Sequence, residues 1–218
     1  MTGLDAGLVL EITLRTIAVC FPAVGVAIVI GLPLGIFLGR RRFAGHGALV
    51  SVVNAGMGAP PVVVGLFGAL LLWRNGLFGS LGLMYSPTAM VLVQIVIALP
   101  FVVGITLASV AALDPDWEHQ VRTLGVPAHW RLWLLLREIR LGLFAAVIAA
   151  LGAVLSEVGA VLMVGGNLQG ETQVLTTAIQ QYTMMGEFEI ASALAIVLLG
   201  FTLIVAALMT AVQQGDRA

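Results

Sequence analysis

The sequence has few charged residues: 10% of its 218 residues are Asp, Glu, Lys or Arg, whereas 60% are hydrophobic. Because a soluble domain carries about 25% charged residues, this composition excludes an ordinary soluble protein. Lysine is absent, and all ten basic residues are arginine. The single cysteine, Cys20, excludes an internal disulfide and a cysteine-based metal site.

The sequence also lacks the motifs of common enzymes. Its three histidines, His46, His119 and His129, fall between the apolar runs, so an intramembrane serine protease would lack its base. There is no G-x-x-x-x-G-K-[ST] phosphate-binding loop, so we do not expect this chain to hydrolyse ATP. No cluster of metal ligands is visible. We predict no catalytic residue, no metal, no cofactor and no nucleic-acid partner.

What the sequence has instead is long apolar runs, each near the 20 residues that a helix needs to cross a hydrocarbon core of about 30 Å. We predict an all-α integral membrane protein that crosses the inner membrane several times. Residues 1–218 would form a single transmembrane domain with about five transmembrane helices. The predicted spans are residues 16–39, 48–73, 88–113, 141–164 and 190–212.

The arginines predict the orientation of these spans, because short loops rich in Lys and Arg stay in the cytoplasm. Arg15 and Arg74 fall on one predicted side. The other eight fall on the opposite side, which places the N-terminus outside and the C-terminus inside: Arg40, Arg41, Arg42, Arg122, Arg131, Arg137, Arg140 and Arg217.

Two shorter helices are predicted on the outer side. Residues 3–15 could form an interfacial helix. Residues 174–185 predict an amphipathic helix, either meeting a soluble partner with its polar face or packing as a lid on the bundle. Its apolar residues recur at helical spacing: Val174, Leu175, Ala178, Ile179, Tyr182 and Met185.

Residues 114–140 form the one long charged segment, between two spans on the predicted cytoplasmic side. Glu118 begins a short helix that should stop at Gly125, because glycine readily takes the left-handed conformation that ends a helix. Pro127 discourages its continuation, and a second helical segment starts near His129. A short helix between two spans could dock on a soluble partner and transmit its movement. An ordinary charged loop is the alternative.

The second span contains residues that break helices. Pro60 and Pro61 should interrupt its hydrogen bonding, and Gly56 and Gly58 allow close approach of backbones. Broken helices in membranes are tolerated where they are buried or line a cavity. We therefore predict either part of a translocation pathway or gate, or a packing kink.

Two polar residues lie inside other spans. Glu157 is the one acid clearly within an apolar run, and a charge there is costly. We expect it to face the protein interior with a structural or gating role rather than to bind substrate. For Gln94, a hydrogen bond between helices is favoured over a role as a ligand.

Three segments resemble permeases of type I ABC importers. Glu118, Gly125 and residues 139–141 are similar to their cytoplasmic loop, which reads Glu-Ala-Ala, three residues, Gly and later Ile-x-Leu-Pro. His119 and Gln120 replace the two alanines, and Gly142 replaces the proline. Residues 54–66, NAGMGAPPVVVGL, are similar to the second-span signature of tungstate-type permeases. Residues 156–160, SEVGA, resemble the Gly-Glu-Phe-Gly-Ala of molybdate and sulfate permeases.

The resemblance implies the permease subunit of an ATP-driven oxyanion importer, with tungstate as the first candidate substrate. It further implies a homodimer in the lipid bilayer, a separate cytoplasmic ATPase that binds ATP and Mg, and an extracytoplasmic substrate-binding protein. The alternatives are a molybdate or sulfate permease, or a non-transporting membrane scaffold or assembly factor.

The resemblance also implies two groups of site residues. Coupling to the ATPase would use the short cytoplasmic helix: Glu118, His119, Gln120, Arg122, Thr123, Leu124 and Gly125. A translocation pathway or gate would use the broken second span and the buried acid: Asn54, Gly56, Met57, Gly58, Pro60, Pro61 and Glu157.

Overall fold

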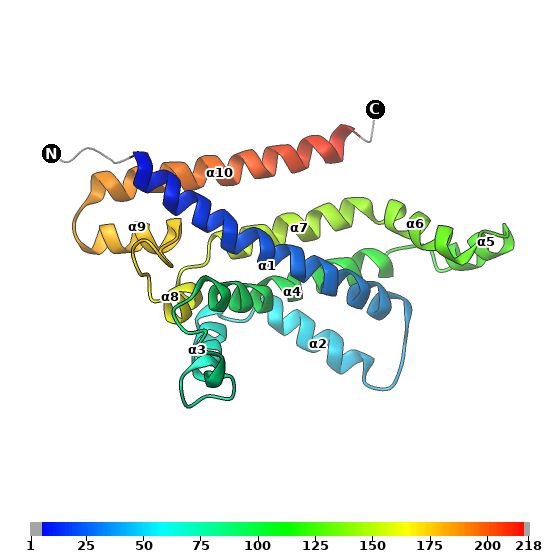
Figure 1. Cartoon of the computed structure of the whole chain (residues 1–218). Coiled ribbons are helices and arrows are strands. Elements are labelled where there is room, and N and C mark those ends of the chain that lie inside the picture. Colours follow the sequence, from blue (N-terminus) through cyan, green and yellow to red (C-terminus); the bar gives the residue numbers. More distant parts are fainter. Residues whose placement is uncertain (1–5, 216–218) are drawn as a thin grey trace.

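The computed structural model describes residues 6–215, and within this range all regular secondary structure is helical (Figure 1). Two long helices, α1 (Ala6–Arg40) and α4 (Pro87–Ala111), pack side by side at its centre. Gly31, Gly35 and Gly39 recur every four residues on the face of α1 that meets α4. A Cβ at any of them would come within 3 Å of an α4 side chain. Small residues let helix backbones approach closely in membranes.

The first helix is longer than predicted. The expected separate interfacial helix at 3–15 is wrong for its described part, because residues 6–15 continue into α1 without a break. At 1.5 Å per residue the 35 residues of α1 extend about 52 Å. Residues 6–15 pack inside the protein rather than at the membrane surface, because Ile12 is buried in a cluster with Leu175 and Leu194.

Among the residues that the structure describes, three helices are each long and apolar enough to cross a membrane: α1, α4 and α10 (Phe188–Gly215). Two bent helix pairs raise the number to at most five, in line with the predicted count. The first pair is α2 (His46–Met57) with α3 (Pro61–Leu72), bent by 101°. The predicted break at Pro60 and Pro61 is therefore confirmed, and it turns α3 away from the direction of α2. A short 3-10 helix, η1 (Gly79–Leu81), follows α3.

The predicted fourth span, 141–164, is not one helix. Helix α7 (Arg140–Leu155) ends before Ser156, and α8 (Gly159–Gly165) begins after Val158. The second bent pair joins α7 to the helix before it, with an angle of 67°. The break has a local cause, because the Glu157 carboxylate accepts the backbone N–H of Ala160 and so begins a new helix instead of continuing the old one.

The remaining helices lie at opposite ends of the molecule (Figure 1). One end carries α5 (Trp117–Thr123) and α6 (Ala128–Glu138), the other α9 (Leu175–Met184). The predicted turn at Gly125 is confirmed by its φ of +70°. In the predicted stripe of α9, Leu175 and Ala178 are buried, with Ile179 and Tyr182 packed beside them. Met185 departs from the stripe: it follows the helix and is 59% exposed.

Candidate functional site

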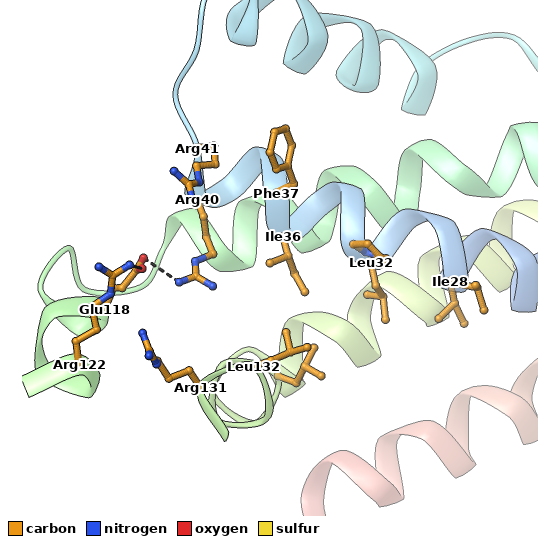
Figure 2. Close-up of a pocket in the computed structure, with 13 residues that line it drawn as sticks. Ile28, Leu32, Ile36, Phe37, Arg40, Arg41, Glu118, Arg122, Arg131 and Leu132 are labelled. Carbon is orange, nitrogen blue, oxygen red and sulfur yellow. Dashed lines mark hydrogen bonds and ion pairs between the residues drawn. The ribbon is translucent and has the colours of Figure 1, made fainter. Parts of the chain in front are cut away.

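The short helix α5 is tied to the end of α1 by an ion pair that the sequence did not predict. Glu118 Oε2 accepts a hydrogen bond from Arg40 Nη2 at 2.8 Å, and Oε1 accepts one from Arg122, one turn later in α5 (Figure 2). No sequence signal links Arg40 to Glu118, because they are 78 positions apart and belong to different elements. This pair connects the predicted coupling helix directly to a membrane helix.

The charges around Glu118 lower the pKa of its carboxyl group from its ordinary value of 4.5. The hydrogen bond from Arg40 is the largest cause. Partial burial opposes it, and the hydrogen bond from Arg122 adds to the lowering. Glu118 is therefore ionised at neutral pH and available to hold both arginines.

Helix α5 is anchored by the buried Val121, which is not one of the predicted coupling residues. The predicted coupling residues lie at the end of the molecule that projects from the bundle (Figure 1). His119, Gln120 and Thr123 are exposed, and Leu124 at the end of the helix is 79% exposed. Their role in coupling stays a prediction.

The helix after α5 anchors this end of the protein to α4. Leu135 and Ile139 are buried against Val110, with Trp117 packed beside them. Gly142, which replaces the proline of the resembled motif, lies so close to Ser109 of α4 that a Cβ would overlap its hydroxyl group. Trp117 of α5 therefore shares one apolar cluster with Val110 of α4.

The predicted pathway residues of the second run pack partly against α4. A Cβ on Gly56 would come within 3 Å of the Pro100 ring, and the thioether of Met57 covers Gly104. By contrast, Asn54, Gly58 and Pro60 are exposed on the surface of this single chain. One part of this break therefore packs against α4, and the other part is exposed on the surface of the single chain.

Glu157 is buried, with 7% of its surface exposed, as predicted for an acid that faces the protein interior. Its Oε1 accepts the backbone N–H of Ala160 at 2.7 Å, and its backbone carbonyl accepts a hydrogen bond from Thr176 of α9 at 2.8 Å. These are structural contacts, and the carboxylate takes the place that a capping side chain occupies at a helix start.

The two helix breaks lie next to each other. Gly65 of α3 lies against Ala160, where a Cβ would come within 3 Å of the Ala160 backbone, and Val62 packs on Gly159. Glu157 and the Pro60–Pro61 break were predicted to belong to one functional group, but no feature of the sequence indicated that they adjoin. The small residues at both positions explain how α3 and α8 come together.

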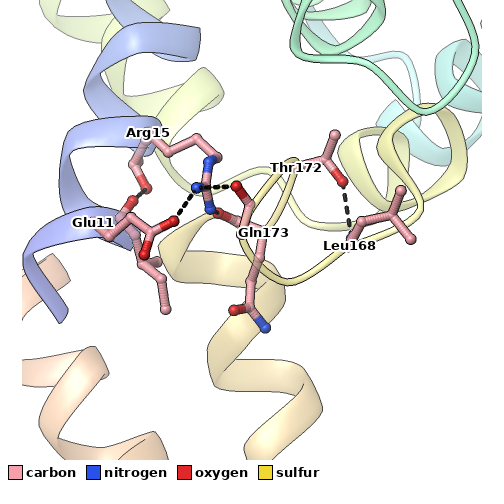
Figure 3. A network of polar contacts seen from close by, with 8 residues as sticks. Glu11, Arg15, Leu168, Thr172 and Gln173 are labelled. Atoms are coloured by element: carbon pink, nitrogen blue, oxygen red, sulfur yellow. Dashed lines mark hydrogen bonds and ion pairs between the residues drawn. The ribbon is translucent and has the colours of Figure 1, made fainter. Parts of the chain in front are cut away.

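The end of the molecule that carries α9 is held by a separate polar network (Figure 3). Arg15 donates to the backbone carbonyls of Gly170 and Gln173, at 2.7 and 3.2 Å, and pairs with Glu11. Gln181 Oε1 accepts hydrogen bonds from Asn167 and Gln173, at 2.8 and 2.6 Å. This amide cluster was not predicted from the sequence, although five amide side chains within the fifteen positions 167–181 were a possible signal.

The buried Gln94 donates from Nε2 to the backbone carbonyl of Val154 in α7, at 3.4 Å. The predicted hydrogen bond between helices is therefore confirmed. Among the residues whose side chains are described, no group of three or more His, Cys, Asp or Glu could hold a metal ion. Arg217, which contributed to the predicted orientation, lies outside the described residues.

The chain is similar to known membrane transport proteins over most of its length. Residues 31–217 match the family described as "Binding-protein-dependent transport system inner membrane component". A probable anion ABC transporter permease protein of Haloferax volcanii is 38% identical, over 91% of this chain and 88% of its own length. The tungstate uptake system permease protein TupB of Peptoclostridium acidaminophilum is 34% identical, over 94% and 90%. The sulfate transport system permease protein CysW of a Synechocystis species is 30% identical, over 84% and 69%.

Proposed function

The chain belongs to the family of binding-protein-dependent transport system inner membrane components, and from this premise we propose that it is the permease subunit of an ATP-driven tungstate importer. The observation that carries the proposal is the projecting helix α5, which is joined to α1 through Glu118 and Arg40. Such a helix gives a separate ATPase a surface to grip at the end of two membrane helices.

The proposed mechanism is alternating access. A cytoplasmic ATPase would dock on the exposed residues His119, Gln120 and Leu124, and α5 would move when two ATPase subunits close on ATP and Mg. The movement would reach α1 through Arg40 and would reach α4 through residues 112–116. Because a partner shifts a conformational equilibrium only by binding the two states differently, the α5 contact must differ between the inward-facing and outward-facing states.

The proposed pathway lies between two copies of the chain. Asn54, Gly58 and Pro60 are exposed in the single protomer, and a broken helix in a membrane is tolerated where it is buried or lines a cavity. A second copy facing this surface would create such a cavity. The adjoining face of α3 is apolar and exposed at Val63 and Phe67, as expected of a surface that meets a partner or lipid.

The proposed orientation places α5 in the cytoplasm and α9 outside, where a substrate-binding protein would deliver the anion. The arginines around α5 support this, because short segments rich in arginine stay inside. The anion itself would meet backbone N–H groups, hydroxyls and amides rather than arginines, which is a known way of binding oxyanions.

Tungstate is proposed as the substrate on two grounds: residues 54–66 resemble the tungstate-type signature, and the chain is similar over most of its length to a tungstate uptake permease. Sulfate is the second candidate, favoured by the similarity to sulfate permeases. Molybdate remains an alternative on the resemblance of residues 156–160 alone.

The deciding experiment is ATP hydrolysis by the complex isolated through this subunit and reconstituted in vesicles with its binding protein. Tungstate, molybdate and sulfate are added in turn, and vesicles without binding protein are the control. Stimulation at the lowest concentration by tungstate is expected. Stimulation by another oxyanion at lower concentration would assign that oxyanion as the substrate and would still support the proposed mechanism. Intact complexes that contain no ATPase would contradict the transport function and favour the scaffold alternative.

A further inference from the structure

A large pocket lies between α1 and the two helices at the arginine-rich end, with a volume of about 850 Å³ (Figure 2). Its walls come from α1, α5 and α6, and it is separate from the helix breaks described above. The proposed transport function leaves this pocket without a role. Its lining is divided into a charged end and an apolar end.

The charged end is strongly basic. Arg40 and Arg41 reach it from the end of α1, and Arg122 and Arg131 from α5 and α6; Glu118 is the one acid in the lining. Four positive charges against one negative leave a net charge of +3. Glu118 pairs with Arg40 and Arg122, and Arg131 Nε donates to the Val126 carbonyl at 2.9 Å. These contacts hold three of the arginines in place, and the lining still carries more positive than negative charge for an anion to bind.

The apolar end runs along α1 toward the middle of the bundle. Ile28, Leu32 and Ile36 line it on one side, and Leu132 and Leu136 of α6 line it on the other. From Ile28 to Phe37 is nine residues, about 14 Å along a helix at 1.5 Å per residue. Half of a hydrocarbon core of about 30 Å is about 15 Å, so this wall matches the depth of one leaflet.

We propose that the pocket binds one anionic phospholipid of the leaflet on the α5 side, with its phosphate among the arginines and an acyl chain along α1. A free oxyanion would use the charged end and leave the apolar wall open. A second copy of this chain that met the pocket with the same surface, across a two-fold axis, would bring the same arginines to it and so meet like charge. An anionic lipid offers a phosphate to the charged end of the pocket and an acyl chain to the apolar end. Basic pockets between membrane helices are known to hold lipid headgroups.

The lipid would have a mechanical consequence. Its phosphate would lie beside the Arg40–Glu118 pair and its chain beside α1, so it would bind α1, α5 and α6 together. Bound lipid would therefore stabilise this end of the permease, and removal of the lipid would loosen the link between α5 and the membrane helices. This inference does not depend on which anion is transported.

The test is native mass spectrometry of the full chain purified in detergent, with phosphatidylglycerol added and phosphatidylcholine as the neutral comparison. Wild type is expected to retain one phosphatidylglycerol and no phosphatidylcholine. The variants Arg131→Gln and Arg41→Gln are expected to lose at least tenfold in the bound fraction. The matched control is Arg137→Gln, which removes the same charge at the same end of the molecule but does not line this pocket. It is expected to bind like wild type.

A variant of the apolar wall separates a lipid from a simple anion. Leu32→Trp fills the space along α1 and leaves every arginine in place, so it should abolish phosphatidylglycerol retention. Inorganic phosphate at millimolar concentration should not displace the lipid. Displacement by phosphate, unchanged retention in Leu32→Trp, or equal loss in Arg137→Gln would each overturn the proposal. So would loss of the lipid when the permease dimer or the complex with its ATPase assembles, which would assign the pocket to a protein partner.

Discussion

At the scale of single residues, the buried polar side chains of this protein mainly serve backbone groups where helices begin, break or approach one another. Glu157 accepts the N–H of Ala160 at the start of α8, and Thr16 accepts the N–H of Leu175 at the start of α9, at 2.9 Å. Unsatisfied backbone groups are costly in a membrane, so such contacts allow short helices such as α8 and α9 to exist inside a bundle.

The role of Glu157 as a cap predicts different effects for two substitutions. Glu157→Gln keeps an oxygen that can accept the Ala160 N–H, whereas Glu157→Ala leaves that N–H without its partner. We expect Glu157→Ala to lower the free energy of unfolding by about 1–2 kcal/mol and to reduce transport, and Glu157→Gln to remain close to wild type. Thermal unfolding in detergent and uptake into vesicles measure both effects. Equal loss in the two variants would show that the charge, and not the cap, is needed.

The lowered pKa of Glu118 predicts a pH dependence. Because its pKa is lower in the folded protein than in the unfolded chain, its ion pairs contribute fully above the ordinary value of 4.5 and are lost as the pH falls through the lowered pKa. The pair is partly exposed, so its contribution should be at most about 1 kcal/mol. A double-mutant cycle of Arg40→Gln and Glu118→Gln, followed by thermal unfolding, should give a coupling at neutral pH that disappears in acid. A coupling that persists in acid would contradict the assignment.

At the scale of elements, the helices differ in the residues that begin and end them, and the end of α5 depends on the backbone conformation of one glycine. It begins after Asp116 and stops where Gly125 takes a φ of +70°. There is open space around the Gly125 Cα, so the backbone conformation, and not a close contact, requires glycine there. Asparagine tolerates this conformation far better than a β-branched residue does.

Substitutions at Gly125 should therefore show whether coupling requires the left-handed backbone conformation at this position or only a small side chain. We expect Gly125→Val to change the end of α5 and to lower ATPase stimulation by the transported anion several-fold, with membrane insertion unchanged. Gly125→Asn is the matched control, since it adds a side chain of similar size and keeps the left-handed turn, and it should retain most of the stimulation. Full stimulation in Gly125→Val would show that the shape of this turn does not matter for coupling.

At the scale of the whole molecule, the protein has two ends with different chemistry and a break between them. Helices α5 and α6 lie at one end and α9 at the other (Figure 1). Most of the described arginines belong to the first end. The second end carries the network of Arg15, Gln173 and Gln181, of which Figure 3 labels Arg15 and Gln173. Helix α4 connects the parts, because it contacts the break at Gly56 and leads into α5 through residues 112–116.

The proposed homodimer predicts a specific cross-link at the break. Gly58→Cys places a thiol on the exposed surface that would face the second copy, and oxidation should join two permease subunits at a rate that changes when ATP is added. Wild type is the control, since its single thiol, on Cys20, is 2% exposed and should not cross-link. Non-reducing electrophoresis of membranes measures the product. A monomeric band under all conditions would place the pathway elsewhere.

Four features could be predicted from the residues alone: the all-helical membrane character, the break at Pro60 and Pro61, the turn at Gly125 and the burial of Glu157. Each of these depends on local chemistry: hydrophobic length, the missing N–H of proline, the freedom of glycine, and the cost of a charge in lipid. Three others became visible only in the folded protein: residues 6–40 form one helix, the fourth apolar run divides at Glu157, and Arg40 pairs with Glu118. These outcomes depend on groups brought together from distant positions: Ile12 with α9 and α10, Gly65 with Ala160, and the end of α1 with α5. The periodicity of the sequence cannot predict these contacts, because they form only when the helices pack together.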